Sequence, residues 1–88
     1  MHYEIRITEY SKRKRNGEIV KTTRNASIDS MSNMYQVAKQ AIDAAYIQDG
    51  AHVRIARMSF DPTTDSFRIE EYEFNVYDRK AEGLKPVK

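Results

Sequence analysis

The most chemically distinctive stretch of the chain is a run of four cations, Lys12-Arg13-Lys14-Arg15, directly before Asn16-Gly17. Asn-Gly between two β-patterned segments is the strongest short signal for a hairpin turn, because a tight primed turn needs positive φ at both central residues. Clustered cations on a two-stranded ribbon bind phosphates by releasing counterions, and such a ribbon fits a nucleic-acid groove. The sequence therefore predicts a nucleic-acid-binding surface made of Lys12, Arg13, Lys14, Arg15, Lys21 and Arg24.

The same cations have a simpler interpretation. Lys and Arg keep exposed hairpins in solution and prevent an edge strand from pairing with other chains. The net charge is only +2. The distribution of charge along the chain is uneven. Residues 1–28 carry seven Lys or Arg and three Glu, whereas residues 29–78 carry four Lys or Arg and nine Asp or Glu. Both interpretations of the basic hairpin stay open, and Tyr10 beside the cluster is a candidate for stacking on a base.

The residue types that perform catalysis are sparse and poorly grouped. The histidines are His2 and His52, and His2 shares a strand face with Glu4 without a third metal ligand in sight. Glu70, Glu71 and Glu73 form an acidic run, but Arg57 and Arg54 face two of them in the predicted hairpin, so ion pairs explain the run better than a carboxylate active site. There is no phosphate loop, nucleophile elbow or zinc spacing. The sequence predicts no catalysis, no cofactor and no metal.

A second candidate surface is apolar. In the segment 51–77 the alternation of apolar residues changes phase, so that Val53, Ile55 and Phe74 lie on one face and a second group lies on the other. That group, with an outward-lying Ile47 on the predicted helix, gives a protein-interface set of Ile47, Met58, Phe60, Phe67 and Ile69. Either a β-bulge returns the second group to one core, or another chain covers it.

These surfaces define the alternative function. A small protein without a catalytic site, with open sheet edges and apolar anchors, fits an inhibitor or adaptor that acts on a host protein complex, as phage and mobile-element proteins do. The charge asymmetry is also compatible with head-to-tail or two-fold association, which makes a homodimer a further expectation. The partners expected from the sequence are thus nucleic acid, a protein, or a second copy of the chain.

One helix is expected to organise the fold. Over Ser30 to Gln48 the apolar residues recur with helical period, with Asp29 or Ser30 as N-cap and Gly50 just past the end. The apolar stripe comprises Met31, Met34, Tyr35, Ala38, Ala41, Ile42, Ala45 and Tyr46, and Val37 lies off its margin.

Two hairpins flank this helix. A two-residue Asn16-Gly17 turn would place Glu9 opposite Arg24 and Ile5 opposite Ile28. The second hairpin turns at residues 61–65, where Pro62 suits a type I turn, and places Phe60 opposite Phe67 and Arg57 opposite Glu70.

These elements give an α+β fold of order ββαββ. The expected architecture is a four-stranded antiparallel sheet, in spatial order 2-1-3-4, with one helix packed on one face. The chain has 88 residues, so we expect one domain over residues 1–78, followed by a flexible basic tail over residues 79–88.

Composition restricts the setting of the protein. The chain has no cysteine, which excludes disulfides, thiolate metal sites and cysteine nucleophiles. No apolar run approaches the length of a signal-peptide core or a membrane span. The sequence therefore predicts a cytoplasmic protein without membrane contact.

Overall fold

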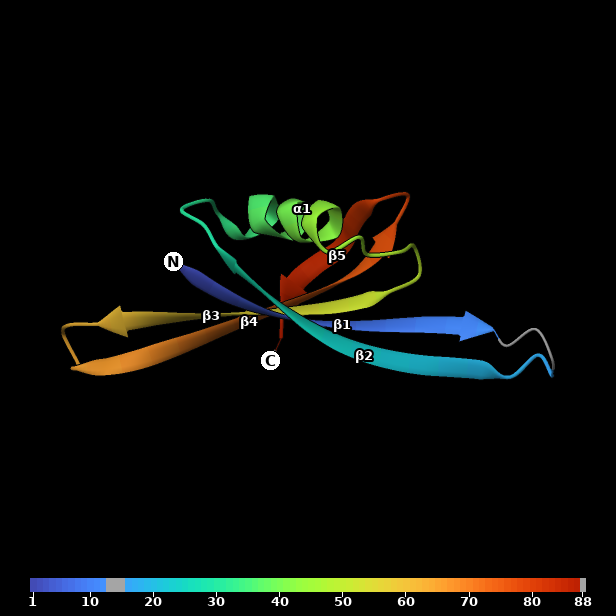
Figure 1. Ribbon diagram of the computed structural model, residues 1–88. Helices are drawn as coiled ribbons and strands as arrows, with labels where there is room; N and C mark the ends of the chain where they lie inside the picture. Colours follow the sequence, from blue (N-terminus) through green and yellow to red (C-terminus); the bar gives the residue numbers. More distant parts are fainter. Residues whose placement is uncertain (13–15, 88) are drawn as a thin grey trace.

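The computed structural model describes residues 1–12 and 16–87. These residues form one antiparallel sheet and one helix, in the order β1 (His2–Lys12), β2 (Ile19–Asp29), α1 (Met34–Ala44), β3 (His52–Asp61), β4 (Ser66–Tyr77) and β5 (Lys80–Pro86). The strand order is β2-β1-β3-β4-β5, and α1 covers one face of the sheet (Figure 1). The predicted α+β class and the order 2-1-3-4 are confirmed, but the sheet has a fifth strand at its edge.

The fifth strand forms where the sequence predicted a flexible tail. Asp78 and Arg79 both have positive φ, 52° and 58°, and Tyr77 pairs with Lys80, which is the geometry of a two-residue primed turn. The ladder between β4 and β5 then shifts register near Gly83, whose φ is +69°. This bulge lets Ala81 and Leu84, three residues apart, both pack against the core. Because Ala81 and Leu84 are three residues apart, the sequence does not show the two-residue alternation by which a strand is recognised.

The helix is shorter than predicted at both ends. Asn33, rather than Asp29 or Ser30, is the N-cap, and its side-chain oxygen accepts a hydrogen bond from the Gln36 amide at 3.0 Å. At the other end Tyr46 adopts a left-handed φ of 51°, and the Ile47 amide donates to the Ile42 carbonyl at 3.1 Å. This is a Schellman ending, and Gly50 belongs to the loop beyond it.

The early helix end changes which side chains are buried. Ile47 was predicted to lie outward as part of a protein interface, but it is buried with 1% exposure, because the Schellman turn directs it back into the core. Val37 is fully buried, whereas Met31, Tyr35 and Tyr46 are exposed. The helix therefore faces the sheet with a stripe rotated from the predicted one.

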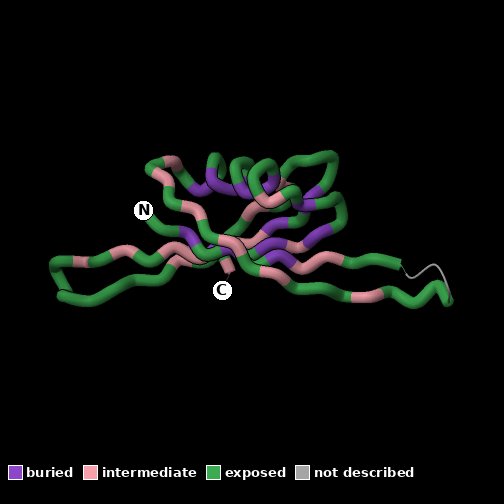
Figure 2. Tube along the Cα trace, in the orientation of Figure 1, coloured by how far each residue is buried: buried purple, intermediate pink, exposed green. Residues whose placement is uncertain are grey.

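The core lies only under the centre of the sheet. Its largest buried side chains are Tyr3, Phe74, Ile5, Ile7, Ile42, Ile47 and Ile55. Strands of 11 residues reach about 36 Å, whereas α1 with its 11 residues spans about 16 Å. Two hairpins therefore project past the helix at opposite ends, and the molecule measures 56 × 20 × 20 Å (Figures 1 and 2).

We call these projections the first arm (residues 8–12 and 19–23) and the second arm (residues 58–61 and 66–69). In the first arm, Ile5 pairs with Ala26 and Lys12 with Ile19, so the predicted register, with Ile5 opposite Ile28, is wrong by two residues. Among the described residues, Glu18 is not part of β2, which begins at Ile19, so Asn16-Gly17 does not join the two strands as a two-residue turn. In the second arm the predicted register is confirmed, with Phe60 opposite Phe67 and Arg57 opposite Glu70.

Candidate nucleic-acid interface

The sheet face opposite α1, which we call the open face, carries the main candidate site. Because Tyr3, Ile5 and Ile7 point to the core, the alternate residues of β1 lie on the open face. Strand pairing adds every second residue of β2 and β3 to the same face. The central and first-arm part of this face contains Arg6, Thr8, Tyr10, Lys12, Lys21, Thr23, Asn25, His52 and Arg54.

Part of this face is hollowed into an open depression. Its volume is about 290 Å³, and it is lined by Arg6, Thr8, Lys21, Thr23, His52 and Arg54. A second depression of about 280 Å³ adjoins it and shares Arg6 and Arg54, but it also has Glu4 and Glu71 in its lining. The first depression is thus lined by side chains that are cationic or hydrogen-bonding, with no carboxylate among them.

The cations of this depression differ in how far they are neutralised. The NH2 group of Arg54 lies 3.7 Å from Glu73 Oε2, so the charge of Arg54 is partly neutralised. Arg6 stands directly opposite Arg54 across the β1–β3 ladder. Among the described residues, Arg6, Lys12 and Lys21 have no carboxylate oxygen within 4.0 Å. Because like charges opposite each other destabilise a sheet, an anion bound between Arg6 and Arg54 would relieve their repulsion.

The sequence-predicted basic residues fall into three groups. Lys12 and Lys21 are exposed on the open face of the first arm. Arg13, Lys14 and Arg15 lie outside the described residues. Arg24 lies on the helix side of the sheet, away from the other two.

Arg24 is engaged in contacts within the molecule. Its Nε donates to Glu9 Oε1 at 2.8 Å, and its NH2 group donates to the Ala45 carbonyl at 2.7 Å. The hydrogen bond from Arg24 lowers the pKa of Glu9 below its ordinary value of 4.5. The predicted Glu9–Arg24 pairing therefore exists, but diagonally across the ladder, because Glu9 pairs directly with Thr22. Arg24 fastens the helix end to the first hairpin, so we exclude it from the candidate interface.

Sequence reasoning omitted Arg6, His52 and Arg54 from the site. Their positions near the base of each hairpin resemble ordinary solvated strand positions. Their convergence depends on the β1–β3 ladder, which joins segments about fifty residues apart and pairs Arg6 with Arg54 and Thr8 with His52. The alternation within each strand predicted the sheet face on which these three residues lie. It did not predict which residue of the other strand lies beside each of them.

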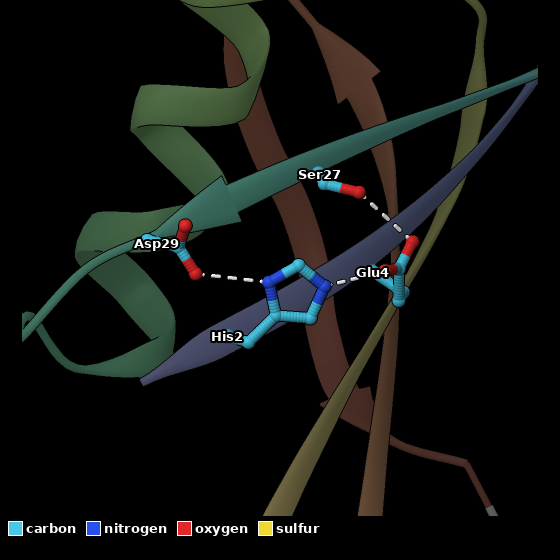
Figure 3. Close-up of polar contacts among 4 residues, drawn as sticks. All are labelled: His2, Glu4, Ser27 and Asp29. Carbon is cyan, nitrogen blue, oxygen red and sulfur yellow. Dashed lines mark hydrogen bonds and ion pairs between the residues drawn. The ribbon is translucent and has the colours of Figure 1, made fainter.

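A polar cluster occupies the end of the open face near the N-terminus (Figure 3). His2 Nδ1 lies 2.9 Å from Asp29 Oδ1, and His2 Nε2 lies 2.5 Å from Glu4 Oε1. Hydrogen bonds to Glu4 and then Asp29 raise the pKa of His2 above 6.5, and the bonds from His2 and then Ser27 lower the pKa of Glu4 below 4.5. This cluster pins the ends of β1 and β2 together.

The chemistry of this cluster differs from that of a nucleophilic site. Ser27 Oγ donates to Glu4 Oε2 at 3.0 Å and does not contact His2, so the Ser–His contact of a hydrolase triad is missing from the group. Over residues 1–12 and 16–87, no group of three or more His, Asp or Glu side chains has an arrangement suited to a metal ion.

The second candidate surface lies on the open face of the second arm. Met58, Phe60, Phe67 and Ile69 are 54%, 53%, 67% and 59% exposed. The β3–β4 ladder runs from Asp61 to His52 without a register shift, so no bulge in it returns these side chains to the core. The Phe60 and Phe67 rings contact each other edge to face, with centroids 5.4 Å apart. Of the two arrangements that the sequence allowed, these four side chains therefore form an apolar cluster separate from the core.

Comparisons with known proteins give no family or relative. No protein-family model matches the chain, and no curated protein or solved structure is significantly similar to it. In the part of the chain that the structure describes, no helix has the length and hydrophobicity needed to cross a bilayer.

Proposed function

We propose that this protein is a non-enzymatic nucleic-acid-binding protein that contacts the phosphate backbone with its open face and first arm. The observation that carries the proposal is the row formed by Arg6, Lys21 and Lys12 along this face, without a carboxylate near any of the three among the described residues. Clustered exposed cations attract a polyanion by releasing its counterions.

The surrounding side chains suit this role. Thr8 and Thr23 pair across the first hairpin and line the same depression as Arg6 and Lys21, so their hydroxyl groups can donate to phosphate oxygens. Tyr10 pairs with Lys21 and is 54% exposed, which leaves its ring free to stack on an unpaired base. Phosphate contacts carry no sequence information, so the proposed binding is largely independent of sequence.

The test is a titration of fluorescently labelled duplex and single-stranded oligonucleotides at two salt concentrations. We expect the wild-type affinity to fall as salt rises. The triple variant Arg6→Gln, Lys12→Gln, Lys21→Gln should bind at least about 100-fold more weakly at low salt, with a shallower salt dependence, because three phosphate contacts are lost.

A matched control separates this surface from net charge. The variant Lys39→Gln, Arg68→Gln, Arg79→Gln removes the same charge from residues outside the open face, and it should keep most of the affinity. Equal weakening in both variants, or no binding by the wild type at low salt, would reject the proposal.

A second candidate function is supported by the apolar second arm. In this alternative, the protein is an inhibitor or adaptor that binds a protein complex through Met58, Phe60, Phe67 and Ile69 and the adjacent sheet edge. The supporting observation is that all four side chains are more than half exposed and lie together on one arm. Exposed apolar groups of this kind mark interaction surfaces more often than isolated apolar residues do.

The alternative is tested with immobilised protein. A specific partner retained from a lysate by the wild type should be lost with the variant Phe60→Ser, Phe67→Ser and kept with the control Tyr35→Ser, which changes an exposed aromatic residue on the helix. Direct binding of the purified partner must reproduce the same order of affinities. If the arm variant and the control retain that partner equally, the second arm is not its binding site.

A further inference from the structure

The two edges of the sheet are built differently. At one edge, β5 has seven residues, a bulge at Gly83, and Pro86, which has no amide hydrogen to donate. Such features prevent an edge strand from pairing with other chains. At the other edge lies β2, beside β1 (Figure 1). It has 11 residues without Gly or Pro, and its ladder with β1 has no register shift. Its outward backbone groups form a regular template for another strand.

The sequence of β2 is complementary to itself in one antiparallel register. If Asn25 lies on a two-fold axis perpendicular to the sheet, Lys21 faces Asp29 of the partner subunit, and Thr23 faces Ser27 of the partner subunit. All of these positions lie on the open face of β2. We propose that two copies of this chain pair through the β2 edge in this register and form one continuous sheet of ten strands.

The charges select this register among its neighbours. Moving the axis by one residue to Arg24 would place two guanidinium groups opposite each other and leave Asp29 facing Ile19. Moving it to Ala26 would place Asp29 opposite Thr23 and leave Lys21 beyond the end of the partner strand. Only the Asn25 axis gives two ion pairs across the junction. Lys21 and Asp29 are both exposed. Asp29 Oδ1 contacts His2 Nδ1 at 2.9 Å, but the Asp29 side chain stays 83% exposed, so it can also reach a partner.

The two charges cannot pair within one molecule. They lie eight residues apart on an extended strand, which is about 26 Å, so any interaction between them must join two chains. The second arm is a competing location for self-association, and the experiment must therefore assign the contact as well as detect it.

The first measurement is the molar mass of the wild type by sedimentation equilibrium. We expect a dimer, with twice the chain mass of 10.3 kDa, at a protein concentration of about 0.1 mM. Lys21→Glu and Asp29→Lys should each weaken dimerisation by about 10-fold, since each converts two attractive pairs into repulsive ones. The double variant should dimerise with nearly wild-type affinity, because swapping both charges restores the pairs in trans.

The control Lys39→Glu makes the same change of charge on the helix, away from the β2 edge, and should leave the dimer intact. A wild-type protein that is monomeric at this concentration overturns the proposal. So does a dimer that survives both single charge reversals, or one that is lost on Phe67→Ser but unaffected by Lys21→Glu, because the second arm would then hold the chains together.

Discussion

The two arms of the sheet have the same backbone architecture, but the open face of one is cationic and that of the other is apolar. Each is an antiparallel hairpin that continues past the helix, and in each the described ladder has no register shift beyond the core. The open face of the first arm carries Lys12, Lys21 and Tyr10, whereas the open face of the second carries Met58, Phe60 and Phe67. Once a strand outruns the element that covers it, burial no longer restricts its side chains, and its surface can be adapted to a partner.

The arms also depend on the same central core, which gives the largest expected effect. Phe74→Ala removes a side chain that is 1% exposed under the helix, and it should lower the free energy of unfolding by about 3–5 kcal/mol. Urea denaturation followed by circular dichroism measures this loss. A loss of that size would unfold much of a small domain at physiological temperature. A cost below about 1 kcal/mol would mean that the centre is not the shared support of both arms.

The first hairpin contains one cation, Arg24, that is hydrogen-bonded within its own chain, beside Lys21, which has no such bond to the described residues, and this contrast gives the second prediction. Arg24→Ala removes hydrogen bonds to Glu9 and to the Ala45 carbonyl, so it should cost about 1–2 kcal/mol of stability. Lys21→Ala should change stability by less than about 0.5 kcal/mol and act on nucleic-acid affinity instead. Urea midpoints and oligonucleotide titrations of both variants check this division. Equal stability losses would contradict it.

The third prediction concerns the second arm and compares the stability cost of Phe67→Ala with that of Phe74→Ala. Phe67→Ala removes an aromatic side chain that is 67% exposed and contacts Phe60, so it should cost no more than about 1 kcal/mol. It should also reduce the binding of a hydrophobic dye, because an exposed apolar group is removed. If the cost equals that of Phe74→Ala, the second arm is part of the core and the contrast between the arms fails.

The smallest expected effect concerns the His2 cluster, which ties β1 to β2 at the end remote from the first arm. The pKa of His2 is raised above 6.5, so its stabilising contribution is complete below pH 6.5 and is lost as pH rises through the raised pKa. The pKa of Glu4 is lowered below 4.5, so its contribution is complete above pH 4.5 and is lost as pH falls through the lowered pKa. Both contributions are therefore present together between pH 4.5 and 6.5.

The urea midpoint should accordingly decrease slightly from pH 6 to pH 8 in the wild type and stay level over that range in His2→Gln. Since the side chains of His2, Glu4 and Asp29 are all more than half exposed, solvent screening keeps the effect small. An NMR titration of His2 provides an independent measurement. A pKa at or below 6.5 would show that the hydrogen bonds to Glu4 and Asp29 do not persist in solution.

Local sequence patterns determined much of the fold. Alternation identified β1 to β4, and matched side chains gave the correct register of the second hairpin, because its turn places Phe60 opposite Phe67 and Arg57 opposite Glu70. The same reasoning failed in the first hairpin, where the register that forms pairs Ile5 with Ala26 and Ile7 with Arg24. It differs from the predicted register by two residues, and a shift of two keeps every side chain on the same face, so alternation cannot distinguish the two.

Only the tertiary structure decided the features that depend on contacts between distant segments. β5 carries no period-two pattern, and it forms because β4 offers a free edge and Leu84 finds the core across a bulge. Ile47 is buried because the helix ends early, and Arg6 meets Arg54 because β1 pairs with β3. Periodicity reports which face of its own element a residue occupies. Which residues pack against that face depends on how the elements are arranged, and the pattern within one segment does not predict that arrangement.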